Sequence, residues 1–169
     1  MGTVYFLTGL SGAGKTTLGG MLYEYIRRDK PNVILLDGDR IRPVYLEDIG
    51  YSEEDRRKGA KRTFRICKML AEQGIDVVVC SICMYDEVRQ WNRDNISDYV
   101  EIYIKVKKDT LIKRNQKGLY VNSNNVVGMD LEFEEPKTPD IILENDGELS
   151  ANEVFNKLIK FLKRRCVMD

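Results

Sequence analysis

The chain has 169 residues, of which 27 are Lys or Arg and 27 are Asp or Glu, and it contains no histidine. This length predicts a single domain, 1–169, that is large enough to bury a hydrophobic core. The balanced charge argues against nucleic-acid binding. No apolar run reaches the roughly 20 residues of a membrane span, and the first predicted strand leaves no room for a signal peptide. We therefore expect a cytoplasmic protein with no membrane partner.

The first predicted element is a short apolar strand, residues 4–7, which leads into the octet G-L-S-G-A-G-K-T of residues 9–16. A helix from Thr17 to about Arg28 follows, with its apolar residues on one side. The octet fits the pattern G-x-x-x-x-G-K-[ST] of a phosphate-binding loop (P-loop). Its glycines let consecutive backbone N–H groups turn toward one anion, and the helix N-terminus adds positive partial charge. The segment therefore predicts a nucleotide-binding site.

The P-loop supplies the residues expected to bind the phosphates of a nucleotide together with Mg²⁺ as cofactor. Lys15 would place a catalytic positive charge near the β- and γ-phosphates, and the Thr16 hydroxyl is a candidate Mg²⁺ ligand. The residues of this segment predicted to bind ATP are Gly9, Ser11, Gly12, Ala13, Gly14, Lys15, Thr16 and Thr17.

Two carboxylates follow the second predicted strand, residues 32–36, as D-G-D. Ligands of open α/β sheets bind beyond the carboxyl ends of the strands, so Asp37 and Asp39 would face the P-loop. Asp37 could hold Mg²⁺ or its waters while Asp39 accepts a proton from an attacking hydroxyl. The basic residues Arg40 and Arg42 suit an anionic acceptor. The alternative interpretation is that D-G-D is only a tight turn, which Asp and Gly favour.

The later elements alternate between helix and strand. A capping box over residues 52–55 predicts a helix that runs to about Gln73 and ends at Gly74, and the Val-rich segment 76–80 is typical of a strand buried on both faces. Then follow a helix around 87–95, a strand over 100–106, a helix over 109–115, a strand over 141–143 and a helix over 151–164. This alternation predicts an α/β fold, an open parallel β-sheet with helices on both faces. Residues 118–138 are polar with little periodicity, which indicates a functional lid of about 115–138.

Residues 80–83 spell C-x-x-C, a pattern that can indicate redox chemistry or zinc. No second cysteine pair lies nearby and the chain has no histidine, which argues against a zinc site. We therefore expect Cys80 and Cys83 to be reduced structural thiols, with a redox role as the open alternative.

Five segments resemble adenylylsulfate (APS) kinases and occur in the order of that family: G-L-S-G-A-G-K-T-T, L-D-G-D-R-I-R, G-Y-S-E-E-D-R, R-N-Q-K-G-L-Y and F-E-E-P-K-T-P-D-I. The similarity spans residues 3 to about 162, and K-G-L-Y with the later E-x-P is far more specific than the P-loop alone. The resemblance implies a P-loop kinase that uses Mg·ATP to phosphorylate the ribose 3′-hydroxyl of a small nucleotide. It leaves the oligomeric state open, with a homodimer as one candidate.

The resemblance also implies roles for individual residues. Asp39 would be the base, and Arg42, Arg56 and Arg62 would hold the phosphate chain of the acceptor. Lys117 would line the site from the lid, and Arg114 would lie beside ATP. The full set predicted to bind the acceptor is Asp37, Arg40, Arg42, Arg56, Arg62, Ser81, Lys117, Gly118 and Leu119.

The chain departs from the family pattern in the acceptor half. Arg40 stands where the family has Asn in D-G-D-N, and Gly59 stands for the Asn of N-I-R-R. The lid motif F-T-G-I-D appears here as V-V-G-M-D, so Val126 replaces the Phe that stacks on adenine in the family, and about five preceding residues are missing. Loss of a base–aromatic stack costs about 1–3 kcal/mol. Either Tyr85 or Trp91 could restore an aromatic face.

These departures favour a relative that phosphorylates a different nucleotide conjugate. The cytidine diphosphoramidate kinases of capsule polysaccharide clusters fit an acceptor with another base and a similarly compact tail. The alternative is an APS kinase that makes 3′-phosphoadenylylsulfate in sulfate assimilation. A non-catalytic P-loop switch is a third hypothesis, against which the intact Lys15, Thr16 and Asp39 argue.

Overall fold

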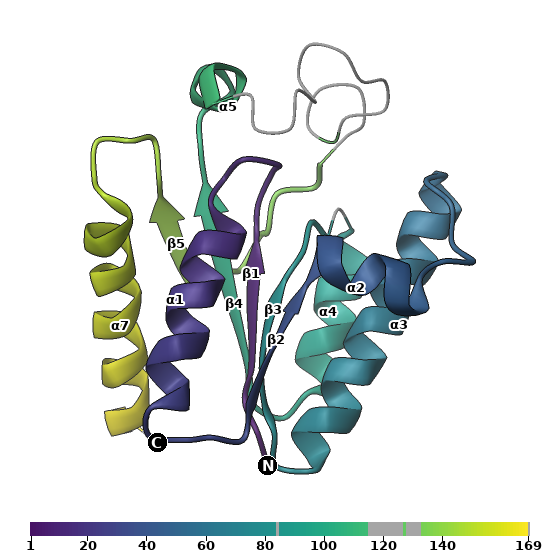
Figure 1. Cartoon of the computed structure of the whole chain (residues 1–169), viewed down its shortest axis with the longest axis horizontal. Helices are drawn as coiled ribbons and strands as arrows, with labels where there is room; N and C mark the ends of the chain where they lie inside the picture. The colour runs from purple at the N-terminus through teal and green to yellow at the C-terminus, as the bar shows by residue number, and fades with distance from the viewer. Residues whose placement is uncertain (84, 115–126, 128–132, 169) are drawn as a thin grey trace.

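The apolar segments of the chain form a five-stranded sheet in which every strand pair is parallel, with strand order β2-β3-β1-β4-β5 (Figure 1). This computed structural model describes residues 1–83, 85–114, 127 and 133–168. The strands are β1 (Val4–Thr8), β2 (Val33–Asp37), β3 (Asp76–Cys80), β4 (Tyr99–Lys105) and β5 (Ile141–Glu144). The helices are α1 (Lys15–Arg27), α2 (Gly38–Tyr45), α3 (Glu53–Glu72), α4 (Asp86–Asn95), α5 (Lys108–Arg114) and α7 (Ala151–Met168).

Helices cover both faces of the sheet, as the alternating sequence predicted. On one face, Val77 and Val79 of β3 pack with Phe64 of α3 in one core cluster. On the other face, Val78 packs with Leu18 of α1 in a second cluster. Side chains of β3 alternate between the two clusters, which explains why its sequence is continuously apolar. The predicted α/β fold is confirmed.

The helix α2 is the element that the sequence prediction missed. The D-G-D segment is the start of this helix rather than a tight turn, because the Asp37 side chain accepts a hydrogen bond from the backbone N–H of Asp39 at 3.0 Å and so caps the helix. Pro43 lies inside α2 and breaks the usual helical pattern, which made the segment hard to identify.

The long helix α3 begins and ends where the sequence predicted. Ser52 caps it by accepting a hydrogen bond from Asp55 N–H at 3.1 Å. At the other end, Gly74 has φ of +81° and its N–H donates to Ala71, while Ile75 N–H donates to Leu70. These two bonds form a Schellman motif, which needs a left-handed residue and so favours glycine. Among the residues that the structure describes, no helix is long and apolar enough to cross a membrane.

Strand register brings the predicted site residues to one edge of the sheet. Asp37 at the end of β2 pairs with Cys80 at the end of β3, and Cys80 also pairs with Leu7 of β1. The segments that follow these strands therefore meet at the carboxyl edge of the sheet, where open α/β sheets bind ligands.

Candidate active site

The P-loop connects β1 to α1, and α1 begins at Lys15, two residues earlier than the sequence predicted. Two glycines explain why the loop can turn so tightly. Gly9 has φ of +148°, and a Cβ there would lie 2.5 Å from the Ile104 carbonyl oxygen. Gly14 has φ of +103°, and a Cβ there would lie 2.8 Å from the side-chain nitrogen of Asn145. Larger residues at either position would strain or displace the loop.

Lys15 reaches back over the loop that precedes it. Its ammonium group donates hydrogen bonds to the carbonyl oxygens of Gly9 and Leu10, at 2.9 and 2.8 Å. Thr16 and Thr17 follow it in the first turn of α1 and are exposed. The loop therefore combines a fixed positive charge with the N-terminus of a helix, which is the arrangement that binds phosphate groups.

Thr16 and Asp37, the two predicted metal ligands, are in contact. The Thr16 hydroxyl donates a 2.6 Å hydrogen bond to Oδ2 of Asp37, whose side chain is buried. Hydroxyl and carboxylate oxygens are the ligand types that Mg²⁺ prefers. Within the described part of the chain, no group of three or more His, Cys, Asp or Glu residues could hold a metal by itself. A pair of protein ligands fits Mg²⁺, which usually keeps waters and substrate phosphates as its other ligands.

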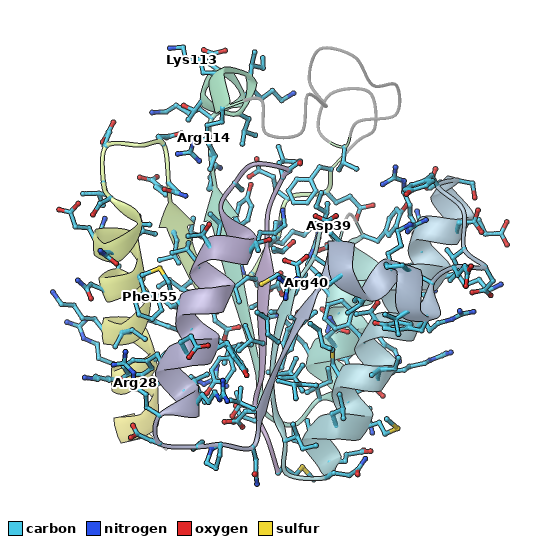
Figure 2. The ribbon with its side chains drawn as sticks, in the orientation of Figure 1. Arg28, Asp39, Arg40, Lys113, Arg114 and Phe155 are labelled. Atoms are coloured by element: carbon cyan, nitrogen blue, oxygen red, sulfur yellow. The ribbon has the colours of Figure 1, made fainter. Side chains whose placement is uncertain are left out.

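Asp39 and Arg40 lie in the first turn of α2, and both are exposed (Figure 2). Asp39 comes two residues after Asp37, at the same edge of the sheet as the P-loop. Asp39 therefore lies at the edge of the sheet where the sequence hypothesis needs a proton acceptor, and this role stays a prediction.

Two predicted acceptor-binding residues, Arg42 and Arg56, meet around Tyr51. The Arg42 guanidinium lies 4.0 Å from the Tyr51 ring centre and donates to the carbonyl oxygens of Ile49 and Gly50, at 2.7 and 2.6 Å. The Arg56 guanidinium lies 5.6 Å from the same ring, and its Nε donates to the Tyr51 carbonyl oxygen at 2.9 Å. The Tyr51 side chain is 65% exposed. Sequence reasoning missed this tyrosine, although it lies inside the motif G-Y-S-E-E-D-R.

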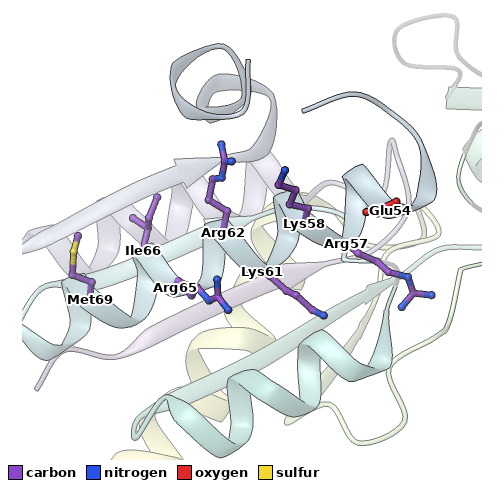
Figure 3. A pocket seen from close by; sticks show the side chains of 8 residues that line it. All are labelled: Glu54, Arg57, Lys58, Lys61, Arg62, Arg65, Ile66 and Met69. Atoms are coloured by element: carbon purple, nitrogen blue, oxygen red, sulfur yellow. The ribbon is translucent and has the colours of Figure 1, made fainter. Parts of the chain in front are cut away.

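Arg62 has other partners. It donates to the Tyr45 carbonyl oxygen at 2.8 Å and to the Asp48 carboxylate at 2.7 Å, and these contacts hold the pKa of Asp48 below its usual value. Arg62 and Lys58 are four residues apart and point to the same side of α3, and Figure 3 shows them among the residues of a hollow on the outer surface of that helix. The structure therefore brings Arg42 and Arg56 together around Tyr51, while Arg62 binds the neighbouring segment at Tyr45 and Asp48.

Ser81 follows β3 at the same edge of the sheet. Its N–H donates to the Leu7 carbonyl oxygen at 3.3 Å, and its Cβ would lie 3.4 Å from a Cβ placed on Gly38. Ser81 therefore lies directly beside the start of α2, close to the two aspartates.

The C-x-x-C cysteines are buried thiols. Burial raises the pKa of Cys80 to about 12 and that of Cys83 to about 11, so neither forms a thiolate near neutral pH. The Cys80 thiol donates to the Lys15 carbonyl oxygen at 3.4 Å, beneath the first turn of α1. This environment supports the structural interpretation of both cysteines.

Arg114, which the resemblance places beside ATP, contacts the P-loop together with a residue that the sequence prediction missed. Arg114 donates to the carbonyl oxygens of Gly12 and Asn145, at 3.2 and 2.6 Å. The Asn145 side chain donates to the Ala13 carbonyl oxygen at 2.8 Å. The signal for Asn145 was its position directly after β5, at the carboxyl end of a strand.

The predicted lid residues Lys117, Gly118 and Leu119 lie outside the described residues, as does Val126. The structure does locate Tyr85, which could have replaced the missing aromatic face. It is 4% exposed, its hydroxyl donates to the Glu53 carbonyl oxygen at 3.0 Å, and its ring lies 3.9 Å from the Arg57 guanidinium. Its ring is therefore packed inside the protein.

Comparison with known proteins agrees with this geometry. The family model for adenylylsulphate kinase matches residues 1–144. The cytidine diphosphoramidate kinase of Campylobacter jejuni is 38% identical over 94% of this chain and 95% of its own length. A probable adenylyl-sulfate kinase of Bacillus subtilis is 34% identical over 96% of this chain and 86% of its own length. The structure of the Mycobacterium tuberculosis APS kinase in complex with AMPPNP and APS is similar with a TM-score of 0.84 and 30% identity, over 96% of this chain and 98% of that one.

These matches cover almost the whole chain, and they include the P-loop, the D-G-D segment and the helices that carry the basic residues. The relatives are kinases that transfer a phosphoryl group to a hydroxyl group. The chain is therefore an ATP-using P-loop kinase and belongs to the adenylylsulphate kinase family.

Proposed function

We propose that this kinase phosphorylates the ribose 3′-hydroxyl of cytidine diphosphoramidate. The observation that carries the proposal is that the chain keeps the family's catalytic and ATP-binding residues but changes residues that bind the acceptor in the family. Lys15, Thr16, Asp37 and Asp39 are all present at one edge of the sheet, whereas Gly59 offers the acceptor no side chain where the family has Asn. The 38% identity with the Campylobacter jejuni kinase of that name supports the same choice.

Buried surroundings make the change at Gly59 informative. This glycine lies in α3, and a Cβ placed on it would lie 3.7 Å from Ile49 and 3.8 Å from Leu46. Its neighbours are therefore aliphatic, and an amide here would need a polar partner from the acceptor to avoid an unsatisfied buried group. A pocket without that amide suits an acceptor with different hydrogen-bonding edges.

In the proposed mechanism, Lys15 and the backbone N–H groups of the P-loop hold the phosphate chain of ATP. Thr16 and Asp37 would hold Mg²⁺, which neutralises developing charge on the phosphates. Asp39 accepts the proton of the 3′-hydroxyl as that hydroxyl attacks the γ-phosphate.

The acceptor would be held by the basic residues that follow the D-G-D segment. Arg42 and Arg56 lie around one exposed aromatic ring, so they can bind a diphosphate-like tail while Tyr51 offers a face to the base. Arg40 adds donors near the site that the family's Asn would not supply.

The test is an ADP-release assay with purified enzyme, Mg·ATP and three acceptors: cytidine diphosphoramidate, APS and simple nucleotides. We expect the highest kcat/KM with cytidine diphosphoramidate. Preference for APS would return the enzyme to sulfate activation, and ATP binding without ADP release on any acceptor would favour the switch hypothesis.

APS is the second candidate acceptor. The likeness to the Mycobacterium tuberculosis enzyme, whose structure holds APS, favours it, as does the exposed ring of Tyr51, which could stack on adenine. With cytidine diphosphoramidate as acceptor, the product would serve polysaccharide modification in the cytoplasm. We also propose a homodimer, which light scattering of the purified protein would test.

A further inference from the structure

Arg89 of α4 is a buried arginine that joins three separate segments. Only 2% of it is exposed. Its guanidinium donates to the Cys83 carbonyl oxygen at 2.7 Å, to the Asp86 carboxylate at 3.1 Å and to the Glu134 carbonyl oxygen at 2.6 Å. These partners lie in the connection after β3, at the start of α4 and in the F-E-E-P segment.

The charge of Arg89 is balanced inside the protein. Its Nε lies 3.6 Å from Oε1 of Glu101 on β4, and Arg93 donates to the other carboxylate oxygen at 2.9 Å. Burial raises the pKa of Glu101, and the two guanidinium groups oppose that rise. Removing one partner of such a buried ion pair is strongly destabilising, whereas a well-packed neutral replacement of the whole group is often tolerated. The stability of the fold therefore does not by itself require a buried arginine at position 89. The segments that its hydrogen bonds connect indicate its role instead.

The Glu134 side chain strengthens the same junction. Its carboxylate accepts a 2.7 Å hydrogen bond from the Asp86 backbone N–H at the start of α4. Lys137 forms an ion pair with the Asp86 carboxylate at 2.5 Å. The motif E-x-P thus has a physical role, because it fastens the chain before β5 onto the N-terminus of α4.

The connection that Arg89 holds lies next to the acceptor side of the site. Ser81 begins this connection beside Gly38, and Tyr85 ends it with a hydrogen bond to Glu53, the first residue of α3. Arg56 lies in the first turns of that helix. A shift of the Cys83 carbonyl would therefore move Ser81 at one end and loosen the start of α3 at the other.

We propose that Arg89 is a positioning residue for the acceptor: through Cys83, Asp86 and Glu134 it fixes the described residues after β3, Ser81 to Cys83, and, through Tyr85, the start of α3. This inference rests on the proposed function only in its assumption that the acceptor lies between Ser81 and Arg56. Arg89 itself does not touch the acceptor. The P-loop lies outside the segments that it holds, so ATP binding should not depend on it.

The test compares Arg89→Gln and Arg89→Lys with Arg165→Gln as a matched control. Arg165 belongs to the same network of ion pairs but is partly exposed, and it pairs with Asp140 and Asp98 at 3.3 and 3.2 Å. Among the described residues, none of its hydrogen bonds reaches the connection. For Arg89→Gln we expect the KM for the acceptor to rise by about 10-fold or more while the KM for ATP stays within about 2-fold. Arg89→Lys should recover part of the loss, and Arg165→Gln should lower the melting temperature without changing either KM.

A second measurement does not need the acceptor. Backbone hydrogen exchange of folded Arg89→Gln should be faster than that of the wild type over residues 81–86 and 53–57, and equal to it over residues 9–16. In Arg165→Gln the exchange rates of all three segments should equal those of the wild type. If Arg89→Gln fails to fold, Glu134→Ala is the alternative variant, because it keeps Arg89 and removes the hydrogen bond to the Asp86 N–H. We expect it to change the exchange rates and the KM for the acceptor in the same direction but by less. Equal exchange in variant and wild type, or a parallel rise of both KM values, would overturn the proposal. A wild-type enzyme that turns over neither nucleotide would instead overturn the proposed function, and the exchange pattern would still decide the role of Arg89.

Discussion

The Thr16 hydroxyl donates a 2.6 Å hydrogen bond to the Asp37 carboxylate, and this bond joins the first turn of α1 to the residue that caps α2. Asp37 thus has two roles that can be separated. Its Oδ1 accepts the Asp39 N–H as a helix cap, and its Oδ2 faces the hydroxyl of the P-loop.

Asp37→Asn and Asp37→Ala should separate these roles. Asn caps a helix about as well as Asp, so Asp37→Asn should keep the stability of the protein, whereas Asp37→Ala should lose about 1 kcal/mol. Both should lose most of the kinase activity, because the amide removes the negative charge that would help to hold Mg²⁺. Urea denaturation and ADP release measure the two effects. Full activity in Asp37→Asn would exclude Asp37 as a metal ligand.

Lys15→Ala should abolish phosphoryl transfer while the protein still folds. The Lys15 ammonium donates to two carbonyl oxygens of the loop at the carboxyl edge of the sheet, so its loss should remove transition-state stabilisation rather than core packing. Thr16→Ala should behave in the same way, and Thr16→Ser is the matched control because it keeps the hydroxyl. ADP release and circular dichroism give the two readouts. Wild-type turnover in folded Lys15→Ala would contradict the assignment of the site.

Asp39→Asn should lower kcat strongly with a smaller effect on ATP affinity. The amide keeps the shape of the side chain but cannot accept the proton of the ribose hydroxyl. Steady-state kinetics at varied ATP concentration provides the measurement. A collapse of ATP binding at normal kcat would instead make Asp39 a metal or structural residue, and Asp37 would become the better candidate for the base.

The cysteines should resist alkylation in the folded protein. Burial raises the pKa of Cys67 and Cys80 to about 12 and of Cys83 to about 11, above the unfolded value of about 8.5. Iodoacetamide at pH 8 should therefore label these three residues in urea and leave them intact without it, as read by peptide mass spectrometry. Rapid labelling of Cys80 or Cys83 in the folded enzyme would revive the redox hypothesis.

The same three thiols predict an alkaline loss of stability. Their folded pKa values are raised, so their contribution is fully present below about pH 8.5 and is lost as the pH rises toward 11, because only the unfolded chain releases the protons. The free energy of unfolding in urea should fall between pH 8 and pH 10. Cys67→Ala should reduce that slope, and an identical slope would show that the buried thiols do not cause it.

The parts of the site that rest on backbone requirements were predictable from the sequence. Glycines and a Lys-Thr pair between an apolar strand and a helix left few alternatives, and the continuous Val run of β3 indicated a strand buried on both faces. The rule that ligands bind at the carboxyl edge of a parallel sheet predicted that Asp37 and Asp39 face the P-loop.

The parts that rest on side-chain direction were not predictable. The resemblance implied that Arg62 holds the acceptor, but sequence position does not say which way a side chain points, and Arg62 donates to Asp48 and Tyr45. Asn145 is one polar residue after a short strand, with no motif around it. Pro43 concealed α2, because a proline near the end of a short helix loses only one backbone hydrogen bond and yet lowers every helix propensity estimate.

The acceptor preference is the prediction that decides the biological role. An exposed ring at Tyr51 gives the base one aromatic face, while Val126 stands where the family has a second. A purine, with its larger face, loses more from a missing stack than a pyrimidine does, and a pyrimidine depends more on hydrogen bonds to its edge. We therefore expect kcat/KM for cytidine diphosphoramidate to exceed that for APS by at least about 10-fold, which needs only about 1.4 kcal/mol of differential transition-state binding.

The control for this prediction is a pair of variants measured with both acceptors. Tyr51→Ala should lower kcat/KM for both, and Tyr51→Phe should keep it, because the ring rather than the hydroxyl would meet the base. Val126→Phe, which restores the family's aromatic residue, should raise kcat/KM for APS more than for the cytidine conjugate and so narrow the preference. Equal or better turnover of APS by the wild-type enzyme would defeat the proposal, since the altered residues would then have no effect on the choice of base.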